Sequence, residues 1–232
     1  MAWSHGSRFD LARRLVAARK GGRLLDYGCG DGTFVAMVHD GFAAARGVDV
    51  EPDQIAGCRE RLGDLPGVSF AMTCDLGPSE RGAWTVVTCM EVLEHCLEPE
   101  RRRILDDLGR LTAHGGLIVV SVPIETGPSL LGKQFFRAAA GLRGLGDYAH
   151  RERYSPLEML RAAAGLAVPR VVYEGHGTGG TFSYHGHKGF DWRQVEGEIA
   201  ERLSIERRMF TPLPWAGSVL NSQVWFICRP RA

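Results

Sequence analysis

The sequence contains no long apolar segment. None of its uninterrupted apolar runs approaches the roughly 20 residues that a helix needs to span a bilayer. Its first residues, which include a histidine, an arginine and an aspartate, also lack the apolar core of a secretory signal. We therefore expect no transmembrane segment and a cytoplasmic location.

The six cysteines form no Cys-x-x-Cys pair, the spacing found in zinc knuckles and in thiol redox motifs. Several of them lie inside apolar, strand-like runs, where a thiol behaves as a small buried hydrophobic group. The pattern is typical of reduced cytoplasmic thiols, and it predicts neither a zinc knuckle nor a redox site.

The sequence also lacks a strong charge of either sign. Its 28 Lys and Arg residues balance 27 Asp and Glu residues, which leaves a net charge of +1. Dedicated nucleic-acid-binding proteins usually carry a basic surplus, so this balance argues against nucleic acid as a partner. There is no internal repeat, and 232 residues with 44% hydrophobic content suffice for one domain with a sizeable core.

Short apolar runs alternate with helical segments along the chain. The expected strands cover residues 23–27, 46–50, 68–74, 84–90, 117–123, 204–210 and 222–228. The expected helices cover residues 8–20, 33–39, 54–62, 98–111 and 191–203. This alternation indicates βαβ units and a doubly wound sheet. Since the last two strands are close enough in sequence to pair antiparallel, we predict an α/β fold with a Rossmann-like sheet of seven strands.

The alternation stops at Pro123 and resumes only near Asp191. Residues 130–142 and 155–164 are helical in pattern, and the glycine-rich residues 175–180 are typical of a flexible loop. We therefore predict a single domain over residues 1–232, with a helical insertion at residues 124–186. Its position after the fifth strand favours a lid or a wall of the substrate site.

A glycine-rich motif follows the first expected strand. Asp26, Gly28, Gly30 and Gly32 form an Asp-x-Gly-x-Gly-x-Gly pattern in the first βα turn, where open α/β sheets bind ligands. A glycine there lets the backbone approach a ligand closely. A dinucleotide fingerprint would need its third glycine at position 33, which is Thr33. The motif therefore argues against a dehydrogenase and resembles motif I of the class I S-adenosylmethionine-dependent methyltransferases.

Three further segments extend this resemblance over residues 24–123. Gly47-Val48-Asp49 ends the second expected strand with a carboxylate, and Cys74-Asp75-Leu76 ends the third with another. The segment from Val86 to His95 is similar to the strand-four signature of the same family. The motifs occur in the family's order and at its spacing, which makes S-adenosylmethionine the expected cofactor.

The resemblance also implies a role for each of these residues. Asp26 orients the amino end of the cofactor's methionine, and Gly28 and Gly30 pack against the cofactor. Asp49 accepts hydrogen bonds from the ribose hydroxyls, and Asp75 accepts one from the adenine amino group. The expected cofactor-binding residues are Asp26, Gly28, Gly30, Asp49, Val50, Asp75, Leu76, Met90 and Glu91.

A cluster of acidic and histidine residues follows the fourth expected strand. Glu91, Glu94 and His95 share one face if the chain is helical there, and such a set suits Mg²⁺ or Mn²⁺. The motif is similar to one in ubiquinone-pathway O-methyltransferases and in small-RNA 2′-O-methyltransferases. The RNA enzymes add a histidine from a segment that resembles the one at His187, where this chain has an extra residue, Gly189.

Two chemical hypotheses follow from this cluster. In the first, Glu91, Glu94, His95 and His187 are ligands of a divalent metal, which polarises the acceptor hydroxyl. In the second, no metal is used, and His95 or His187 is the catalytic base. The sequence leaves both open.

The sequence favours methyl transfer to a hydroxyl of a small molecule, such as a secondary metabolite, a quinone or a glycan precursor. One alternative is an RNA 2′-O-methyltransferase, which the near-neutral charge opposes. The other is a non-catalytic protein that only binds S-adenosylmethionine, which the intact cofactor motif opposes. The sequence sets no expectation for the oligomeric state.

Overall fold

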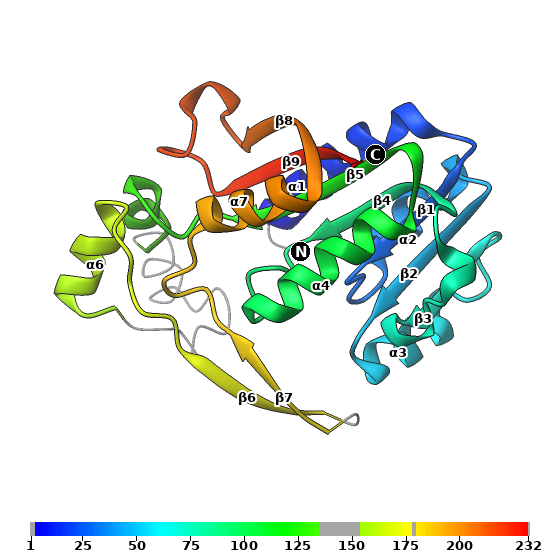
Figure 1. Ribbon diagram of the computed structural model, residues 1–232, viewed down its shortest axis with the longest axis horizontal. Helices are drawn as coiled ribbons and strands as arrows, with labels where there is room; N and C mark the ends of the chain where they lie inside the picture. The colour runs from blue at the N-terminus through cyan, green and yellow to red at the C-terminus, as the bar shows by residue number, and fades with distance from the viewer. Residues whose placement is uncertain (1–2, 135–153, 178–179, 232) are drawn as a thin grey trace.

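The computed structural model describes residues 3–134, 154–177 and 180–231 (Figure 1). Its main feature is a sheet of seven strands in the order β3-β2-β1-β4-β5-β9-β8. The strands are β1 (Arg23–Tyr27), β2 (Ala44–Asp49), β3 (Val68–Met72), β4 (Trp84–Met90), β5 (Thr112–Pro123), β8 (Leu203–Thr211) and β9 (Gln223–Pro230). The expected seven-stranded Rossmann-like sheet is thus confirmed.

Parallel pairing brings the carboxyl ends of five strands to one edge of the sheet. β1 pairs in parallel with β2 and β4, β2 with β3, and β4 with β5. β9 is antiparallel to both β5 and β8, as the sequence predicts for the last pair. Ligands of open α/β sheets bind at this carboxyl edge, which therefore locates the candidate site.

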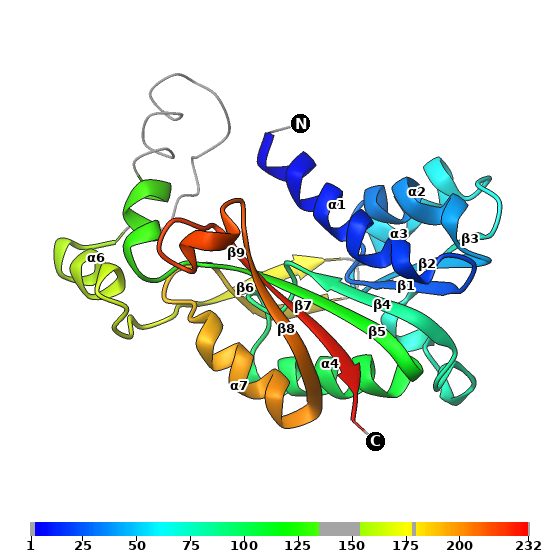
Figure 2. The ribbon, with the colours of Figure 1, turned by 90° about the horizontal axis from the view of Figure 1, so that it is seen from above.

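Helices cover both faces of the sheet (Figure 2). One face carries α1 (Trp3–Val16), α2 (Thr33–Val38) and α3 (Pro52–Leu62), and the other carries α4 (Glu98–Leu111) and α7 (Trp192–Arg202). Short 3₁₀ segments lie at Ala17–Arg19, His39–Gly41, Thr73–Asp75, Pro78–Glu80 and Pro214–Ala216. Because side chains alternate along a strand, Leu24 packs into the core under α1–α3, whereas Leu25 packs into the core under α4 and α7.

A buried ion pair fixes the two helices of the second face to each other. Arg101 on α4 donates to both carboxylate oxygens of Glu198 on α7, over 2.7 and 2.8 Å. Both side chains are less than a tenth exposed. This fork geometry satisfies two buried charged groups together, and it fixes the position of α7, which follows the segment that carries His187.

The insertion after β5 is helical only in part. Residues 128–134 and α6 (Pro156–Ala163) are helical, and α6 starts at the expected capping box, in which Glu158 donates its backbone N–H to the Ser155 hydroxyl over 3.3 Å. The rest of the helix expected at 130–142 lies outside the described residues. Between α6 and α7 the chain forms a two-stranded hairpin of β6 (Val172–Gly177) and β7 (Gly180–His185).

The loop expected at residues 175–180 is wrong for residues 175–177 and 180, which lie in β6 and β7, and residues 178–179 lie outside the described residues. Gly175 lies opposite Phe182, and a Cβ on Gly175 would come within 2.5 Å of the Phe182 ring. The glycine therefore gives space to an aromatic ring from the facing strand. Next to it, the rings of Tyr173 and Tyr184 stack with their centroids 5.6 Å apart. Cross-strand aromatic contacts of this kind outweigh the weak strand propensity of glycine.

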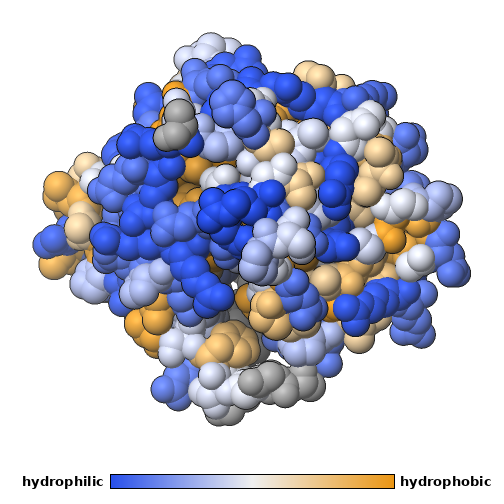
Figure 3. Space-filling view, turned by 45° about the vertical axis from the view of Figure 1, so that its right-hand side comes forward, coloured by the Kyte–Doolittle hydropathy of each residue, from blue (hydrophilic) through white to orange (hydrophobic). Residues whose placement is uncertain are grey.

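The surface is predominantly hydrophilic on the face seen in Figure 3, where hydrophobic residues are scattered among hydrophilic ones. In the described part of the chain, none of the helices combines the length and the apolar character needed to cross a membrane.

Candidate active site

The glycine-rich turn after β1 forms the floor of a cleft at the carboxyl edge of the sheet. Gly28 has a φ of 78°, a conformation that strains other residues. A Cβ on Gly28 would lie 2.3 Å from Val92 Cγ2, so this position must be glycine for packing. Gly30 also has a positive φ, but a Cβ there would meet no atom within 4 Å. The backbone at Gly30 therefore faces open space in which a ligand fits.

Replacement of Gly28 with alanine is expected to lower the free energy of unfolding by about 1–3 kcal/mol, because it adds backbone strain and a clash with Val92. The matched control is Gly57→Ala on α3, where a Cβ meets no atom within 4 Å. That change is expected to be neutral or to stabilise the helix by up to about 1 kcal/mol. Chemical denaturation measures both, and equal stabilities of the two variants would contradict the role of Gly28.

Asp26 lies in the cleft as a buried carboxyl group. It is 3% exposed, and Thr88 on the neighbouring strand β4 donates a hydrogen bond to Asp26 Oδ1 over 2.6 Å. Burial raises the pKa of Asp26 to about 7, the Thr88 hydrogen bond opposes this rise, and the nearby charge of Asp49 adds to it. A cationic group in the cleft would favour ionised Asp26, so the site fits the ammonium group of the expected cofactor.

The cleft has a volume of about 370 Å³, and five of the expected cofactor-binding residues line it. These are Asp26, Gly28, Gly30, Met90 and Glu91. The sequence predicts these contacts because all five lie at the ends of the adjacent strands β1 and β4.

The other four expected cofactor-binding residues lie outside this cleft, further along the same edge of the sheet. Asp49 ends β2, where its carboxylate accepts hydrogen bonds from Gly30 N over 2.9 Å and from Glu51 N over 3.1 Å. Val50 follows it and is 73% exposed. Asp75 accepts a hydrogen bond from Met72 N over 3.0 Å just after β3, and Leu76 is half-buried. This arrangement fits a long ligand that extends from Asp26 across Gly30 towards β3.

A second, larger cavity of about 1030 Å³ adjoins the cleft. Its lining residues are Arg8, Leu11, Arg14, Glu91, Glu94, His95, Pro123, Glu125, Lys133, His187, Met209, Thr211, Pro212, Pro214, Ser222 and Gln223. Arg8 and Glu91 line both spaces and form an ion pair, with Arg8 Nη1 3.4 Å from Glu91 Oε2. Glu91 has a φ of 57°, rare for a residue other than glycine, and such strain is concentrated at functional sites.

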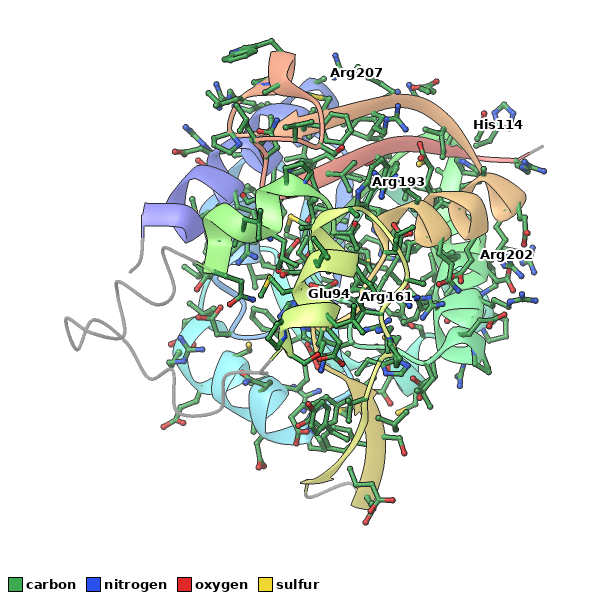
Figure 4. All side chains as sticks on the ribbon, turned by 90° about the vertical axis from the view of Figure 1, so that its left-hand side faces the viewer. Glu94, His114, Arg161, Arg193, Arg202 and Arg207 are labelled. Atoms are coloured by element: carbon green, nitrogen blue, oxygen red, sulfur yellow. The ribbon has the colours of Figure 1, made fainter. Side chains whose placement is uncertain are left out.

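Glu94 is a fully buried carboxyl group in the wall of the large cavity. In the described structure neither of its carboxylate oxygens has a hydrogen-bond partner. Burial raises the pKa of Glu94 well above its ordinary value, and the charges of Glu91 and Glu125 raise it further. Figure 4 looks onto the side of the molecule that carries α6 and shows Glu94 near the centre of the view. The cavity therefore contains a buried carboxyl group with unused hydrogen-bonding capacity, and its burial favours the protonated form.

The two candidate catalytic histidines meet in this cavity. The rings of His95 and His187 are in edge-to-face contact, with centroids 4.9 Å apart. His95 Nδ1 lies 3.1 Å from the carbonyl oxygen of His185. Because a carbonyl only accepts, Nδ1 carries the proton, and Nε2 retains its lone pair in the neutral ring. His95 Nε2 lies 3.9 Å from Glu94 Oε1.

The four candidate metal ligands line one cavity, but their side chains do not converge. Among the residues that the structure describes, no three His, Cys, Asp or Glu side chains are arranged to hold a metal ion. The helix that would place Glu91, Glu94 and His95 on one face is not formed: the chain makes turns there, and His95 N donates to Val92 O over 3.0 Å. Glu91 is instead paired with Arg8.

Four charged residues of the cavity are absent from the residues expected from the sequence. Arg8 and Arg14 are on α1, and Glu125 and Lys133 form an ion pair of 3.0 Å in the insertion. Arg8 lies in the expected amphipathic helix at residues 8–20, and nothing in the sequence distinguishes it from the solvent-exposed arginines of that helix. The only signal for Glu125 is its position directly after the fifth strand, where parallel sheets place functional side chains.

Comparisons with known proteins agree with this geometry. Residues 5–168 match a family model described as a methyltransferase domain. A ubiquinone biosynthesis O-methyltransferase from Burkholderia thailandensis is 29% identical over 163 residues, which cover 65% of this chain and 67% of that protein.

Two crystal structures share the fold. One, of a protein from Pyrococcus horikoshii, has a TM-score of 0.65 and 17% identity and covers 99% of this chain and 92% of its own. The other is the N-methyltransferase NodS from Bradyrhizobium japonicum in complex with S-adenosyl-L-homocysteine. It has a TM-score of 0.58 and 14% identity and covers 97% of this chain and 87% of its own.

Proposed function

We propose that this chain, which belongs to the methyltransferase domain family and is a class I S-adenosylmethionine-dependent methyltransferase, methylates a hydroxyl group of a small molecule. The observation that carries this proposal is the adjoining pair of cavities. The smaller one has the expected cofactor motif as its floor, and the larger one contains the His95 and His187 rings. Arg8 and Glu91 lie between the two.

The size and lining of the larger cavity support a small-molecule acceptor. Its volume of about 1030 Å³ is near the upper end of the usual range for small-ligand sites, and its wall combines apolar side chains such as Met209 with a few polar groups. The similarity to a ubiquinone biosynthesis O-methyltransferase also favours an oxygen acceptor. We infer a hydroxyl group of a quinone, secondary-metabolite or glycan precursor.

The side chains of the larger cavity suggest how such a hydroxyl is activated. S-adenosylmethionine, when bound, would supply an electrophilic methyl group whose bond to the sulfonium sulfur breaks on transfer, which would leave S-adenosylhomocysteine. His95 Nε2 has the lone pair required to take the hydroxyl proton as the new oxygen–carbon bond forms, and the carbonyl of His185 holds the ring in the required tautomer. The main contribution of the protein is then alignment of the oxygen with the methyl carbon.

The test is an acceptor screen. The protein is incubated with S-adenosylmethionine labelled in its methyl group and a panel of phenols, catechols, hydroxylated sugars and short RNAs. We expect label in an ether-linked methyl group of a small molecule. Label in RNA alone would support the 2′-O-methyltransferase instead, and binding of S-adenosylhomocysteine by calorimetry with no transfer to any acceptor would support the non-catalytic protein.

The same assay separates the two chemical hypotheses. If His95 is the base, activity persists in EDTA. If activity is lost in EDTA and returns with Mg²⁺ or Mn²⁺, a metal polarises the hydroxyl, and the role proposed for His95 Nε2 is wrong.

A further inference from the structure

Arg170 links the two segments that carry the paired histidines. It lies between α6 and β6, and its Nη2 donates to the carbonyl oxygens of Glu94 and Gly186, the second over 2.9 Å. Glu94 immediately precedes His95, and Gly186 immediately precedes His187. One guanidinium group therefore bonds to the peptide unit next to each histidine, although the histidines are far apart in the sequence.

A second set of contacts joins the same two segments. His185 N donates to the carbonyl oxygen of His95 over 2.8 Å, and His95 Nδ1 donates to the carbonyl oxygen of His185 over 3.1 Å. The end of β7 is thus bonded both to the backbone and to the ring of His95. If the two segments moved apart, the ring would lose the acceptor that fixes its tautomer.

The segment after His187 is packed against the residues just before Arg170. Phe190 N donates to the carbonyl oxygen of His187 over 3.1 Å, which closes a turn, and Gly189 at its third position has a φ of 73°, a conformation that favours glycine. A Cβ on Gly189 would lie 2.3 Å from the carbonyl oxygen of Val168. The extra residue of this chain, Gly189, is therefore what lets the turn approach the irregular segment that leads from Val168 to Arg170.

We propose that Arg170 is a positioning residue for methyl transfer. It sets the relative placement of His95 and His187 through the two carbonyl groups that precede them, and thereby keeps His95 Nε2 unprotonated in the acceptor cavity. This inference rests on the proposed function, in which His95 takes the proton of the acceptor. Arg170 is not in the lining of the cavity, so it acts through the histidines and not on the acceptor.

The chemistry of arginine suits this role. Two N–H groups on one planar nitrogen reach two carbonyl oxygens at once, and Arg170 Cζ lies over the Phe190 ring, 5.2 Å from its centroid, which is a cation–π contact. A lysine ammonium has the donors but not the planar stacking surface. Lysine at position 170 is therefore expected to restore the function in part, and glutamine is not.

The matched control is Arg229. It likewise donates to two neighbouring carbonyl groups, those of Gly115 and Gly116, over 2.5 and 3.1 Å. These carbonyls lie near the start of β5, opposite the carboxyl edge that carries the site. Arg229→Gln removes the same kind of contact without touching the histidines.

The first measurement needs no acceptor. Long-range ¹H–¹⁵N correlation spectra of histidine-labelled protein at pH 8 report which ring nitrogen of His95 carries the proton, with assignment from the spectrum of His95→Ala. The wild type and Arg229→Gln are expected to show a single tautomer with the proton on Nδ1. In Arg170→Gln the two nitrogen shifts should converge as both tautomers exchange, and Arg170→Lys should lie between. An unchanged His95 signal in Arg170→Gln would overturn the proposal.

The second measurement uses the acceptor that the labelled screen identifies. Arg170→Gln is expected to lower kcat by about tenfold to a hundredfold, because small displacements of a catalytic group have effects of this size. The KM for S-adenosylmethionine should remain within about twofold of the wild-type value, since Arg170 does not line the cofactor cleft. Equal losses in Arg170→Gln and Arg229→Gln would show a general effect on folding and contradict the proposal.

These outcomes separate the positioning role from the proposed function. If no acceptor is methylated but the His95 tautomer depends on Arg170, the proposed function fails and the structural link stands. If Arg170→Gln does not fold, as judged by loss of S-adenosylhomocysteine binding, the His95 signals of Arg170→Lys and the wild type are compared instead. A shift of the Arg170→Lys signal towards exchange between tautomers supports the proposal, and an unchanged signal contradicts it.

Discussion

Replacement of Asp26 with asparagine is expected to weaken binding of S-adenosylhomocysteine by about 2–5 kcal/mol, because it removes one partner of a buried charge pair. Asp26 is 3% exposed, so water does not replace its interaction with the ligand ammonium. Asparagine preserves the shape of the side chain and an acceptor for the Thr88 hydroxyl. Isothermal titration calorimetry measures the change. Wild-type affinity in this variant would show that Asp26 does not contact the cofactor.

The same residue makes cofactor binding depend on pH. Since the pKa of Asp26 is about 7 in the free protein, the carboxyl group is mostly protonated below this pH and must lose its proton to pair with an ammonium group. Affinity should therefore fall by up to about tenfold for each pH unit below 7. Above pH 7 it should be constant until the amino group of the ligand deprotonates. In Asp26→Asn this dependence should be absent, and an unchanged pH profile would contradict the assignment.

The stability of the ligand-free protein should depend on pH in the opposite direction: it decreases as pH rises, whereas the affinity for the cofactor increases. The pKa of Asp26 rises from 3.8 to about 7 on folding, so the folded state binds more protons than the unfolded state between these values. The free energy of unfolding contributed by this group therefore decreases as pH rises through that window. Without ligand, Asp26→Asn should be more stable than the wild type at pH 8. Ionised Asp26 thus lowers the free energy of unfolding of the free protein, and the same charge pairs with the ammonium group when the ligand is bound.

Replacement of His95 with alanine is expected to lower kcat by about 10²–10⁴-fold, the usual contribution of a general base. His95 lies in the lining of the larger cavity but not in that of the cofactor cleft, so the dissociation constant for S-adenosylhomocysteine should change by less than about twofold. The two quantities are measured by labelled-methyl transfer to the identified acceptor and by calorimetry.

The control for this variant is His114→Ala. His114 is exposed near the start of β5, and Figure 4 shows it well away from Glu94. The His114→Ala variant should leave both kcat and the dissociation constant for S-adenosylhomocysteine unchanged. Full activity of His95→Ala would mean that this ring only supports the end of β7 through its hydrogen bond to His185.

The sequence predicts the sheet and the cofactor side of the site because their signals are local. Asp26, Gly28 and Gly30 lie within one βα turn, and their spacing alone indicates what the turn binds. Strand alternation likewise predicts that the ends of β1 and β4 are adjacent.

The acceptor side depends on contacts between distant residues, and the sequence predicts much less of it. The hairpin is missed because Gly175 forms a strand only when Phe182 lies over it. The expected helical face at Glu91 is wrong because the backbone there adopts a left-handed conformation. No pattern near Arg170 indicates that it bonds to carbonyl groups of two remote segments.

The ion pair between Arg8 and Glu91 also has a thermodynamic consequence. Each of these side chains faces both cavities, so a ligand that draws the Arg8 guanidinium towards itself changes the charge that Glu91 presents to the other ligand. Binding at the two sites is then energetically coupled, and by linkage each ligand alters the affinity of the other by the same factor. We therefore expect the dissociation constant for S-adenosylhomocysteine to change when a ligand occupies the larger cavity, and calorimetry with and without that ligand measures the factor.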